Sequence, residues 1–306
     1  MKIFLEILAA AAGLWLLFVF IPTLTVFVIL FGRKGCRSFS PEHLETSYYA
    51  PFRDRIVEAT RKLSELPCRE LSCSAPDGTR LSGRLLGEPG KTVILAHGYR
   101  SAGGSPLAVQ ALRFAERGWA VLLPDQRAHG NSGGRFTTMG ILESGDLRRW
   151  AELASSLPGN RRTAVYGMSM GATSAAFASA DIAADAMVLD CPFDSPSDQL
   201  RRICRDRRLP AFLLVPAGIL IARLLCRVDF SLRASDVLRK ARVPALFICG
   251  SADSTVPPDG VRAMSDACPT SAGCVLVEGA EHSVAFLAGG EELAERVERF
   301  ISGRDT

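Results

Sequence analysis

Residues 163–171 read TAVYGMSMG, and residues 172–180 continue as ATSAAFASA, a run of mostly small side chains. The apolar run 163–166 is typical of a short buried strand, and the small residues suit a helix. The pentapeptide Gly167-Met168-Ser169-Met170-Gly171 between them predicts a tight turn, which needs small flanking residues. Such a turn holds the serine hydroxyl out of the sheet, beside the free N–H groups of a helix N-terminus. We therefore predict Ser169 as a nucleophile.

The chain on both sides of this stretch alternates between short apolar runs and helix-like segments. The predicted strands are 92–96, 120–123, 163–166, 186–189, 245–248 and 274–277, and the helices are 106–117, 141–157, 170–180, one from about 258, and 291–301. Before them, 70–74 and 79–86 alternate around Asp77-Gly78, which predicts a β-hairpin. This order is typical of βαβ units, so we expect an α/β fold with a mostly parallel central sheet and helices on both faces.

A serine hydroxyl needs a base, and the chain offers four histidines. His43 precedes the predicted fold. His97 ends the first buried strand, and we interpret Gly98-Tyr99 after it as backbone for an oxyanion hole. His129 lies in a polar loop that we interpret as structural. His282 lies between the last strand and the last helix, and the chain order serine, acid, histidine of this kind of fold favours it as the base.

The base needs an acid that fixes its tautomer and stabilises the imidazolium. Asp253 follows the strand that ends at Ile248 and lies between the serine and the histidine in the chain. Asp190 and Asp194 follow the preceding strand and are the alternative acids. A turn or helix-cap role is the competing interpretation for each aspartate.

One stretch of about 192–242 interrupts the alternation and predicts a cap insertion. It begins with a basic cluster and continues with the apolar run 209–226, which Pro210, Pro216 and Gly218 interrupt. An insertion there lies over the strand C-termini, where ligands bind in open α/β sheets. Three structures fit this pattern: a lid, a helix that rests on the membrane with its basic cluster toward anionic headgroups, and an ordinary amphipathic cap helix. The cluster consists of Arg201, Arg202, Arg205, Arg207 and Arg208.

The N-terminus carries 25 residues without a charge, 7–31. A helix of this length is about 37 Å long and crosses a hydrocarbon core of about 30 Å. The run is longer than the apolar part of a signal peptide and ends at a basic stretch, which favours an uncleaved anchor kinked at Pro22 over a signal peptide or a core helix. Three basic residues follow the run, Arg33, Lys34 and Arg37, whereas only Lys2 and the α-amino group precede it. Because the more positive flank stays in the cytoplasm, this predicts a cytoplasmic catalytic domain.

Composition limits the remaining choices. Of 306 residues, 48% are apolar and 22% charged, which excludes a disordered chain, and the net charge of +4 does not indicate a nucleic-acid partner. The nine cysteines form no metal-type pair and suit small core residues in a reducing compartment. If the domain were external, Cys68 with Cys73 and Cys268 with Cys274 are the candidate disulfides.

These motifs together resemble the α/β-hydrolase superfamily over about residues 71–301. They are His97-Gly98-Tyr99, the loop 125–132, Gly167 to Gly171, Gly250-x-x-Asp253 and Gly279-x-x-His282. The chain looks most like membrane-anchored bacterial serine hydrolases of the serine-aminopeptidase-like branch. The resemblance implies a Ser169, Asp253 and His282 triad and an oxyanion hole made by the backbone N–H groups of Tyr99 and Met170.

The resulting expectation is a membrane anchor over 1–37, a connector with an amphipathic helix over 38–67, and a hydrolase domain over 68–306. The connector helix is indicated by Phe52, Ile56, Val57 and Leu63, which recur at roughly helical spacing. The expected reaction is acyl transfer from an ester, thioester or amide to water, on an acylated or lipid-like small-molecule substrate at membrane lipid, with no cofactor or metal. A serine aminopeptidase and a non-catalytic membrane adaptor are the alternatives. The sequence leaves the oligomeric state open.

Overall fold

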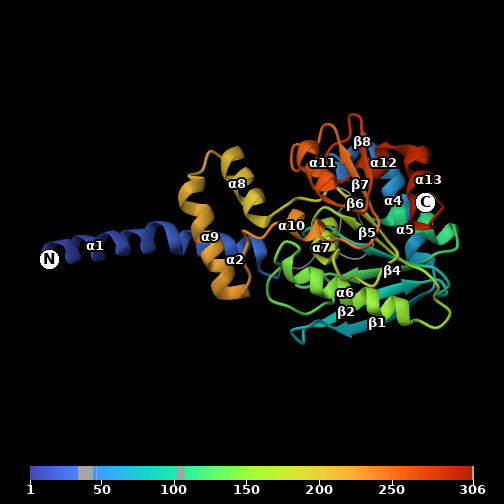
Figure 1. The fold of residues 1–306 in the computed structure, drawn as a ribbon, viewed down its shortest axis with the longest axis horizontal. Helices are drawn as coiled ribbons and strands as arrows, with labels where there is room; N and C mark the ends of the chain where they lie inside the picture. The colour runs from blue at the N-terminus through green and yellow to red at the C-terminus, as the bar shows by residue number, and fades with distance from the viewer. Residues whose placement is uncertain (34–43, 46, 102–106, 305–306) are drawn as a thin grey trace. The chain divides into compact units, whose positions relative to one another are not determined.

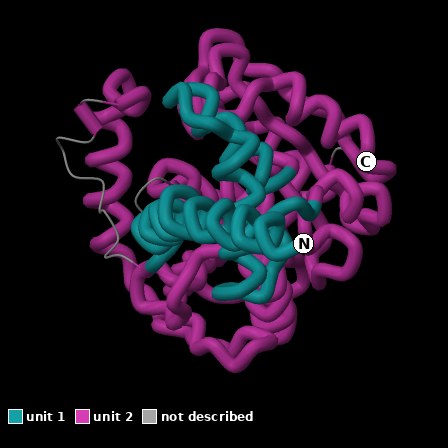
Figure 2. The backbone as a smooth tube through the Cα atoms, turned by 90° about the vertical axis from the view of Figure 1, so that its left-hand side faces the viewer, with its two compact units in different colours: residues 1–32, 195–232 teal, residues 33–194, 233–306 magenta. Residues whose placement is uncertain are grey.

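The computed structural model describes residues 1–33, 44–45, 47–101 and 107–304. The described chain forms two compact units, residues 1–32 with 195–232 and residues 33–194 with 233–306 (Figure 2). His43, Cys36, Lys34 and Arg37, together with part of the expected connector, lie outside the described residues.

The larger unit is built on an eight-stranded sheet of order β1-β2-β4-β3-β5-β6-β7-β8 (Figure 1). The strands β1 and β2 form the predicted hairpin and pair antiparallel, as do β2 and β4, while all other neighbours are parallel. The sheet is therefore mostly parallel, as predicted. Its strands are β1 (Cys68–Ser74), β2 (Arg80–Leu86), β3 (Thr92–Ala96), β4 (Ala120–Asp125), β5 (Thr163–Met168), β6 (Ala186–Asp190), β7 (Ala245–Gly250) and β8 (Ser271–Val277).

Alternate residues of the central strands face two separate cores. Val93 and Leu95 of β3 belong to one core, and Ile94 and Ala96 belong to the other. Both faces are covered by helices, which explains why these strands are apolar throughout rather than alternating. One face carries α4 (Arg53–Glu65), α5 (Ala108–Glu116), α12 (Ala285–Ala288) and α13 (Gly290–Ile301), and the other carries α6 (Ile141–Ser156), α7 (Met170–Ala178), α10 (Ala234–Leu238) and α11 (Pro258–Ala267).

The helix predicted in the connector exists as α4, after the short 3-10 turn Ala50–Phe52. Its buried residues are Ile56, Ala59 and Leu63. Val57, also noted in the sequence, lies beside this apolar stripe on a 3.6-residue period and is 43% exposed.

The smaller unit contains the N-terminal helical run and most of the insertion. The run consists of α1 (Lys2–Trp15), a π-helical turn (η1, Leu16–Phe20) and α2 (Ile21–Phe31). Among the described residues it is the helical run long and apolar enough to cross a membrane. The irregularity lies one turn before Pro22, whose ring would crowd the carbonyl of Phe18 four residues earlier in a regular helix.

Of the insertion expected at about 192–242, the smaller unit holds two helices, α8 (Pro196–Asp206) and α9 (Ala211–Cys226), while α10 belongs to the larger unit. Pro210 precedes α9, and the helix continues through Pro216 and Gly218 without a break. The apolar run 209–226 is thus a continuous helix over most of its length.

The cysteines described by the structure are all free thiols. Cys68 and Cys73 lie five residues apart on the single strand β1, roughly 16 Å along the chain, so they cannot form the disulfide considered from the sequence. Cys274 of β8 lies beside Cys249 of β7, with 3.6 Å between the two sulfur atoms.

Candidate active site

The turn between β5 and α7 holds Ser169 in an unusual backbone conformation, with φ 54° and ψ −115°. A positive φ is costly for a residue with a side chain and persists where the surroundings fix it. Here the Ser169 N–H donates to the Asp190 carbonyl at 2.8 Å, and the Thr173 N–H donates to the Ser169 carbonyl at 2.9 Å. The serine is therefore held at the sharp strand-to-helix turn that its sequence predicted.

Close backbone contacts explain both glycines of this turn. A Cβ atom at Gly171 would lie 2.0 Å from the Ala96 carbonyl oxygen at the end of β3. A Cβ at Gly167 would lie 2.5 Å from the Gly171 carbonyl oxygen. Any larger residue at either position would push α7 away from the sheet, so the glycines fix where the serine lies.

Ser169, His282 and Asp253 form one continuous line of hydrogen bonds. The Ser169 Oγ lies 2.9 Å from His282 Nε2, and His282 Nδ1 lies 2.8 Å from Asp253 Oδ2. This arrangement has a hydroxyl, a base within reach of its proton, and a carboxylate behind the base, which is the geometry of an activated serine.

The loops that carry the acid and the base are tied together next to β7. The Ala252 N–H donates to the Ala280 carbonyl at 3.0 Å, and the Ser251 Oγ accepts from the Gly279 N–H at 2.8 Å. A Cβ at Gly250 would lie 2.1 Å from the Ala280 carbonyl oxygen, so only glycine allows this approach. The relative position of Asp253 and His282 follows from these contacts.

The carboxylate of Asp253 is fully occupied. Its Oδ1 accepts from the Thr255 N–H at 2.9 Å and from the Val256 N–H at 2.7 Å, while Oδ2 faces His282. Burial acts to lower the pKa of His282, but Cys191 and the Asp253 carboxylate outweigh it, so the pKa of the imidazole is raised above its usual value.

Comparison with known proteins agrees with this fold. A model of the serine aminopeptidase S33 family matches residues 87–225. The Pyrococcus furiosus esterase Pf2001 superposes with a TM-score of 0.64 and 25% identity, covering 79% of this chain and 92% of the esterase. The chain has the α/β-hydrolase fold.

Two further similarities extend the comparison. The uncharacterized protein YqkD of Bacillus subtilis is 29% identical over 220 residues, which cover 69% of this chain and 70% of YqkD. A thermophilic esterase of Thermogutta terrifontis has a TM-score of 0.57 at 17% identity and covers 78% of this chain and 100% of its own, a likeness of fold alone. The family match and the esterase neighbours support hydrolase activity.

The alternative acids considered from the sequence have other partners. Asp190 is buried at the end of β6 and accepts from the Tyr166 hydroxyl at 2.6 Å, and burial raises its pKa to about 6. Asp194 accepts from the Ser235 N–H at 2.8 Å and pairs with Arg233. Asp253 is thus the aspartate that bonds the His282 imidazole.

Two other histidines bind backbone. The Nε2 of His97 accepts from the Gln126 N–H at 3.0 Å, and the Nε2 of His129 accepts from the Arg100 N–H at 3.0 Å. Burial lowers the pKa of both imidazoles, to about 3 for His97, so both are neutral. They join the loops after β3 and β4, which agrees with the structural role expected for His129.

The two residues expected to supply oxyanion N–H groups lie next to the serine. Met170 is the first residue of α7, where the N–H has no acceptor within the helix. A Cβ at Gly98 would lie 3.6 Å from the Ser169 Cβ, which places the Gly98-Tyr99 backbone beside the nucleophile.

Sequence reasoning missed two residues near the imidazole. The Tyr48 ring lies 6.3 Å from that of His282, edge to face, and burial raises the pKa of its hydroxyl to about 12. Tyr48 and Tyr49 are adjacent aromatics in a polar connector, and that pair was the available signal. Cys191 follows β6 with φ 47° and is fully buried.

Cys191 also bears on metal binding. Its sulfur and the donor atoms of Asp253 and His282 lie within 4.8 Å of one another, close enough in principle for a metal ion. Two of these donors already bond each other at 2.8 Å, and burial raises the pKa of the Cys191 thiol, which disfavours the thiolate that a metal needs. The arrangement therefore fits proton transfer better than metal binding.

Proposed function

We propose that this protein is a serine hydrolase that transfers an acyl group from an ester or thioester to water. The observation that supports it most is the line from Ser169 Oγ through His282 to Asp253, with 2.9 Å and 2.8 Å between successive polar atoms. In this proposal Ser169, His282 and Asp253 are the catalytic residues.

The reaction has two acyl transfers. Ser169 Oγ attacks the carbonyl carbon as its proton moves to His282 Nε2, and the imidazolium then gives this proton to the leaving alcohol or thiol. Water attacks the acyl-enzyme and loses a proton to His282, which returns a proton to Ser169 Oγ as the acid product leaves. Asp253 keeps the Nδ1 proton on the imidazole and stabilises its charged form.

The backbone N–H groups of Tyr99 and Met170 would donate to the carbonyl oxygen as it becomes negative. Each such donor contributes about 3–4 kcal/mol to transition-state stabilisation in enzymes of this kind. Both sit in backbone positions set by Gly98 and by the first turn of α7, which supports preorganised donors.

The substrate is proposed to be acylated or lipid-like and to reach the enzyme at a membrane. The supporting features are the apolar helical run Lys2–Phe31 and the apolar helix α9. The proposed orientation has the hydrolase domain in the cytoplasm, supported by the basic residues after the run. Reporters fused after Thr306 test this orientation. Activity of a reporter that works only outside the cytoplasm would overturn it.

Aminopeptidase activity is the second candidate, because the matching family is described as serine aminopeptidase. Such an enzyme needs negative charge for the substrate amine. Residues 195–232 instead contain seven arginines against three aspartates, which counts against it.

Full-length protein in detergent micelles tests both candidates. The assay compares p-nitrophenyl esters of increasing acyl length, matching thioesters and aminoacyl arylamides, with Ser169→Ala as the control. We expect ester and thioester turnover that Ser169→Ala removes. Turnover of arylamides alone would favour the aminopeptidase, and no turnover of any substrate by folded protein would leave a non-catalytic adaptor.

A further inference from the structure

The helix α9 exposes large apolar side chains that a soluble surface rarely carries. Phe212 is 78% exposed and Leu224 is 62% exposed, while Leu220 and Leu225 are each more than one-third exposed. Apart from Arg223, every residue of Ala211–Cys226 is apolar. A helix that is apolar all round belongs in a protein core or in lipid, and α9 is not fully covered by protein.

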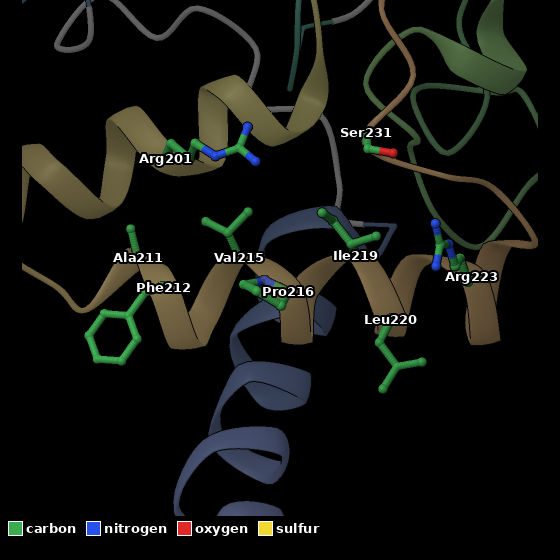
Figure 3. A pocket seen from close by; sticks show the side chains of 9 residues that line it. All are labelled: Arg201, Ala211, Phe212, Val215, Pro216, Ile219, Leu220, Arg223 and Ser231. Carbon is green, nitrogen blue, oxygen red and sulfur yellow. The ribbon is translucent and has the colours of Figure 1, made fainter.

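The same compact unit contains the proposed membrane anchor, and α9 contacts its C-terminal part. The helix α9 touches η1 and α2, and the ring of Phe230 just after α9 lies 5.8 Å from Phe27 and 5.5 Å from Phe31. In Figures 1 and 3, α9 crosses the anchor rather than running along it. If the anchor stands across a bilayer, α9 therefore lies close to the bilayer plane.

The length of the anchor sets the depth of α9. The run Lys2–Phe31 has 30 residues, about 45 Å of helix, against about 30 Å of hydrocarbon. Counted from the first residue after Glu6, about 20 residues fill the core, so the end of α2 from about Phe27, which Phe230 contacts, reaches the interface. Because α9 crosses the anchor there, it lies at the depth of the headgroups and the first acyl carbons.

The two sides of α9 differ in the way an interfacial helix requires. Figure 3 shows Phe212 and Leu220 on the side toward which the anchor extends, and Arg201 of α8 and the Arg223 guanidinium on the opposite side. Between α8 and α9 these residues line a pocket of about 440 Å³, with Val215 and Ile219 on its floor. The apolar side would enter the acyl region while the arginines remain at headgroup level.

Charge specifies the kind of lipid. The segment 195–232 carries seven arginines and three aspartates, a formal charge of +4, which equals that of the whole chain. Arg201 pairs with Asp198 at 2.8 Å and Arg223 pairs with Asp229, yet both side chains are more than half exposed. A guanidinium that shares one carboxylate retains N–H groups for a phosphate.

We propose that α9 lies in the membrane interface and that the α8–α9 pocket, which Arg201 and Arg223 line, binds the headgroup of an anionic lipid. The inference rests on the proposed anchor and goes beyond the proposed hydrolysis. It selects the membrane-resting helix from the interpretations that the sequence left open. The enzyme is then held to an anionic bilayer by two elements, the anchor and α9.

The test uses full-length protein in lipid nanodiscs whose acyl chains carry bromine, a tryptophan quencher. The emission of Phe212→Trp and Leu220→Trp reports the depth of α9. The native Trp15 reports the depth of the anchor, and its emission is obtained by comparison with Trp15→Phe. The exposed control is Leu276→Trp on β8. We expect at least about a twofold loss of the added emission at 212 and 220 and none at 276. Quenching of Trp15 alone would overturn the inference and keep the anchor, whereas no quenching of Trp15 would overturn the anchor.

The arginines are tested by varying the anionic lipid fraction. In the Phe212→Trp background, we expect Arg201→Gln and Arg223→Gln each to raise the phosphatidylglycerol fraction needed for the same quenching about fivefold. This factor corresponds to roughly 1 kcal/mol of attraction for each arginine near the membrane surface. Arg239→Gln is the matched control, because Arg239 pairs with Asp236 at 2.8 Å three residues away, as Arg201 does with Asp198. An equal effect of all three, or a shift produced by inorganic phosphate in neutral discs, would contradict a lipid headgroup site. If the protein forms dimers and the Trp residues on α9 are then not quenched, the apolar side of α9 is covered by a second copy of the chain instead of by lipid.

Discussion

Gly250 at the end of β7 approaches Ala280 so closely that a Cβ on Gly250 would lie 2.1 Å from the Ala280 carbonyl oxygen. The contact joins the loop of the proposed acid to the loop of the proposed base. We predict that Gly250→Ala lowers kcat/KM at least about tenfold, equivalent to about 1.4 kcal/mol, because the loops must separate. Gly260→Ala in α11, where a Cβ meets nothing within 4 Å, should leave activity unchanged. Equal activity of both variants would show that the contact does not position Asp253.

Two buried aspartates near the imidazole should behave differently. Asp253→Asn should lower kcat about 10⁴-fold, since the amide no longer holds the imidazole in the required tautomer. Asp190→Asn should keep activity within about tenfold, because Asp190 bonds the Tyr166 hydroxyl. The steady-state rates of the two variants on one ester decide the matter, and a larger loss for Asp190→Asn would reverse the assignment of the acid.

The raised pKa of His282 predicts an alkaline pH profile. The base must be neutral to accept the Ser169 proton, and a raised pKa means that this form grows in only at higher pH. The rate of labelling by a fluorophosphonate should therefore rise with pH, with a midpoint above the usual 6.5 of a histidine. A midpoint below 6.5 would mean that burial outweighs the Asp253 carboxylate.

The loop after β4 is stabilised by a buried ion pair. Arg127 donates to both carboxylate oxygens of Asp146, at 2.7 Å and 2.5 Å, and both side chains are almost fully buried. Arg127→Ala leaves the Asp146 charge without its partner and should cost about 3–5 kcal/mol. That corresponds to a fall in Tm of roughly 6–20 °C for a domain of this size.

The control for this prediction is a surface pair. Arg149→Ala removes the half-exposed contact with Glu152 and should cost about 0.2–1 kcal/mol. Thermal unfolding followed by circular dichroism compares the two variants. Similar values of Tm for both would show that the Asp146 carboxyl is neutral in the folded protein.

The sequence predicted the sheet and the chain positions of the site because both depend on local patterns. Short apolar runs mark buried strands, and Ser169, Asp253 and His282 each follow such a run. Parallel strands end at one edge of the sheet, so residues distant in the chain can meet there.

Contacts that no local pattern encodes were not predictable. The approach of Tyr48 to His282 joins a connector to the last loop, and no periodicity marks it. The contact of Cys249 with Cys274 depends on the register between β7 and β8, which includes a bulge. The continuity of α9 through Pro216 runs against the helix-breaking tendency of proline, so local propensity does not predict it.

Covalent labelling of Ser169 tests the central claim most directly. A fluorophosphonate probe reacts with a serine only when its hydroxyl is activated, and loss of a catalytic residue typically lowers such reactivity by roughly 10⁴-fold or more. We predict that the full-length protein in detergent is labelled at Ser169 and that Ser169→Ala and His282→Ala are not. Absence of labelling in folded wild-type protein, also after addition of lipid, or equal labelling of His282→Ala, would contradict the proposed serine hydrolase.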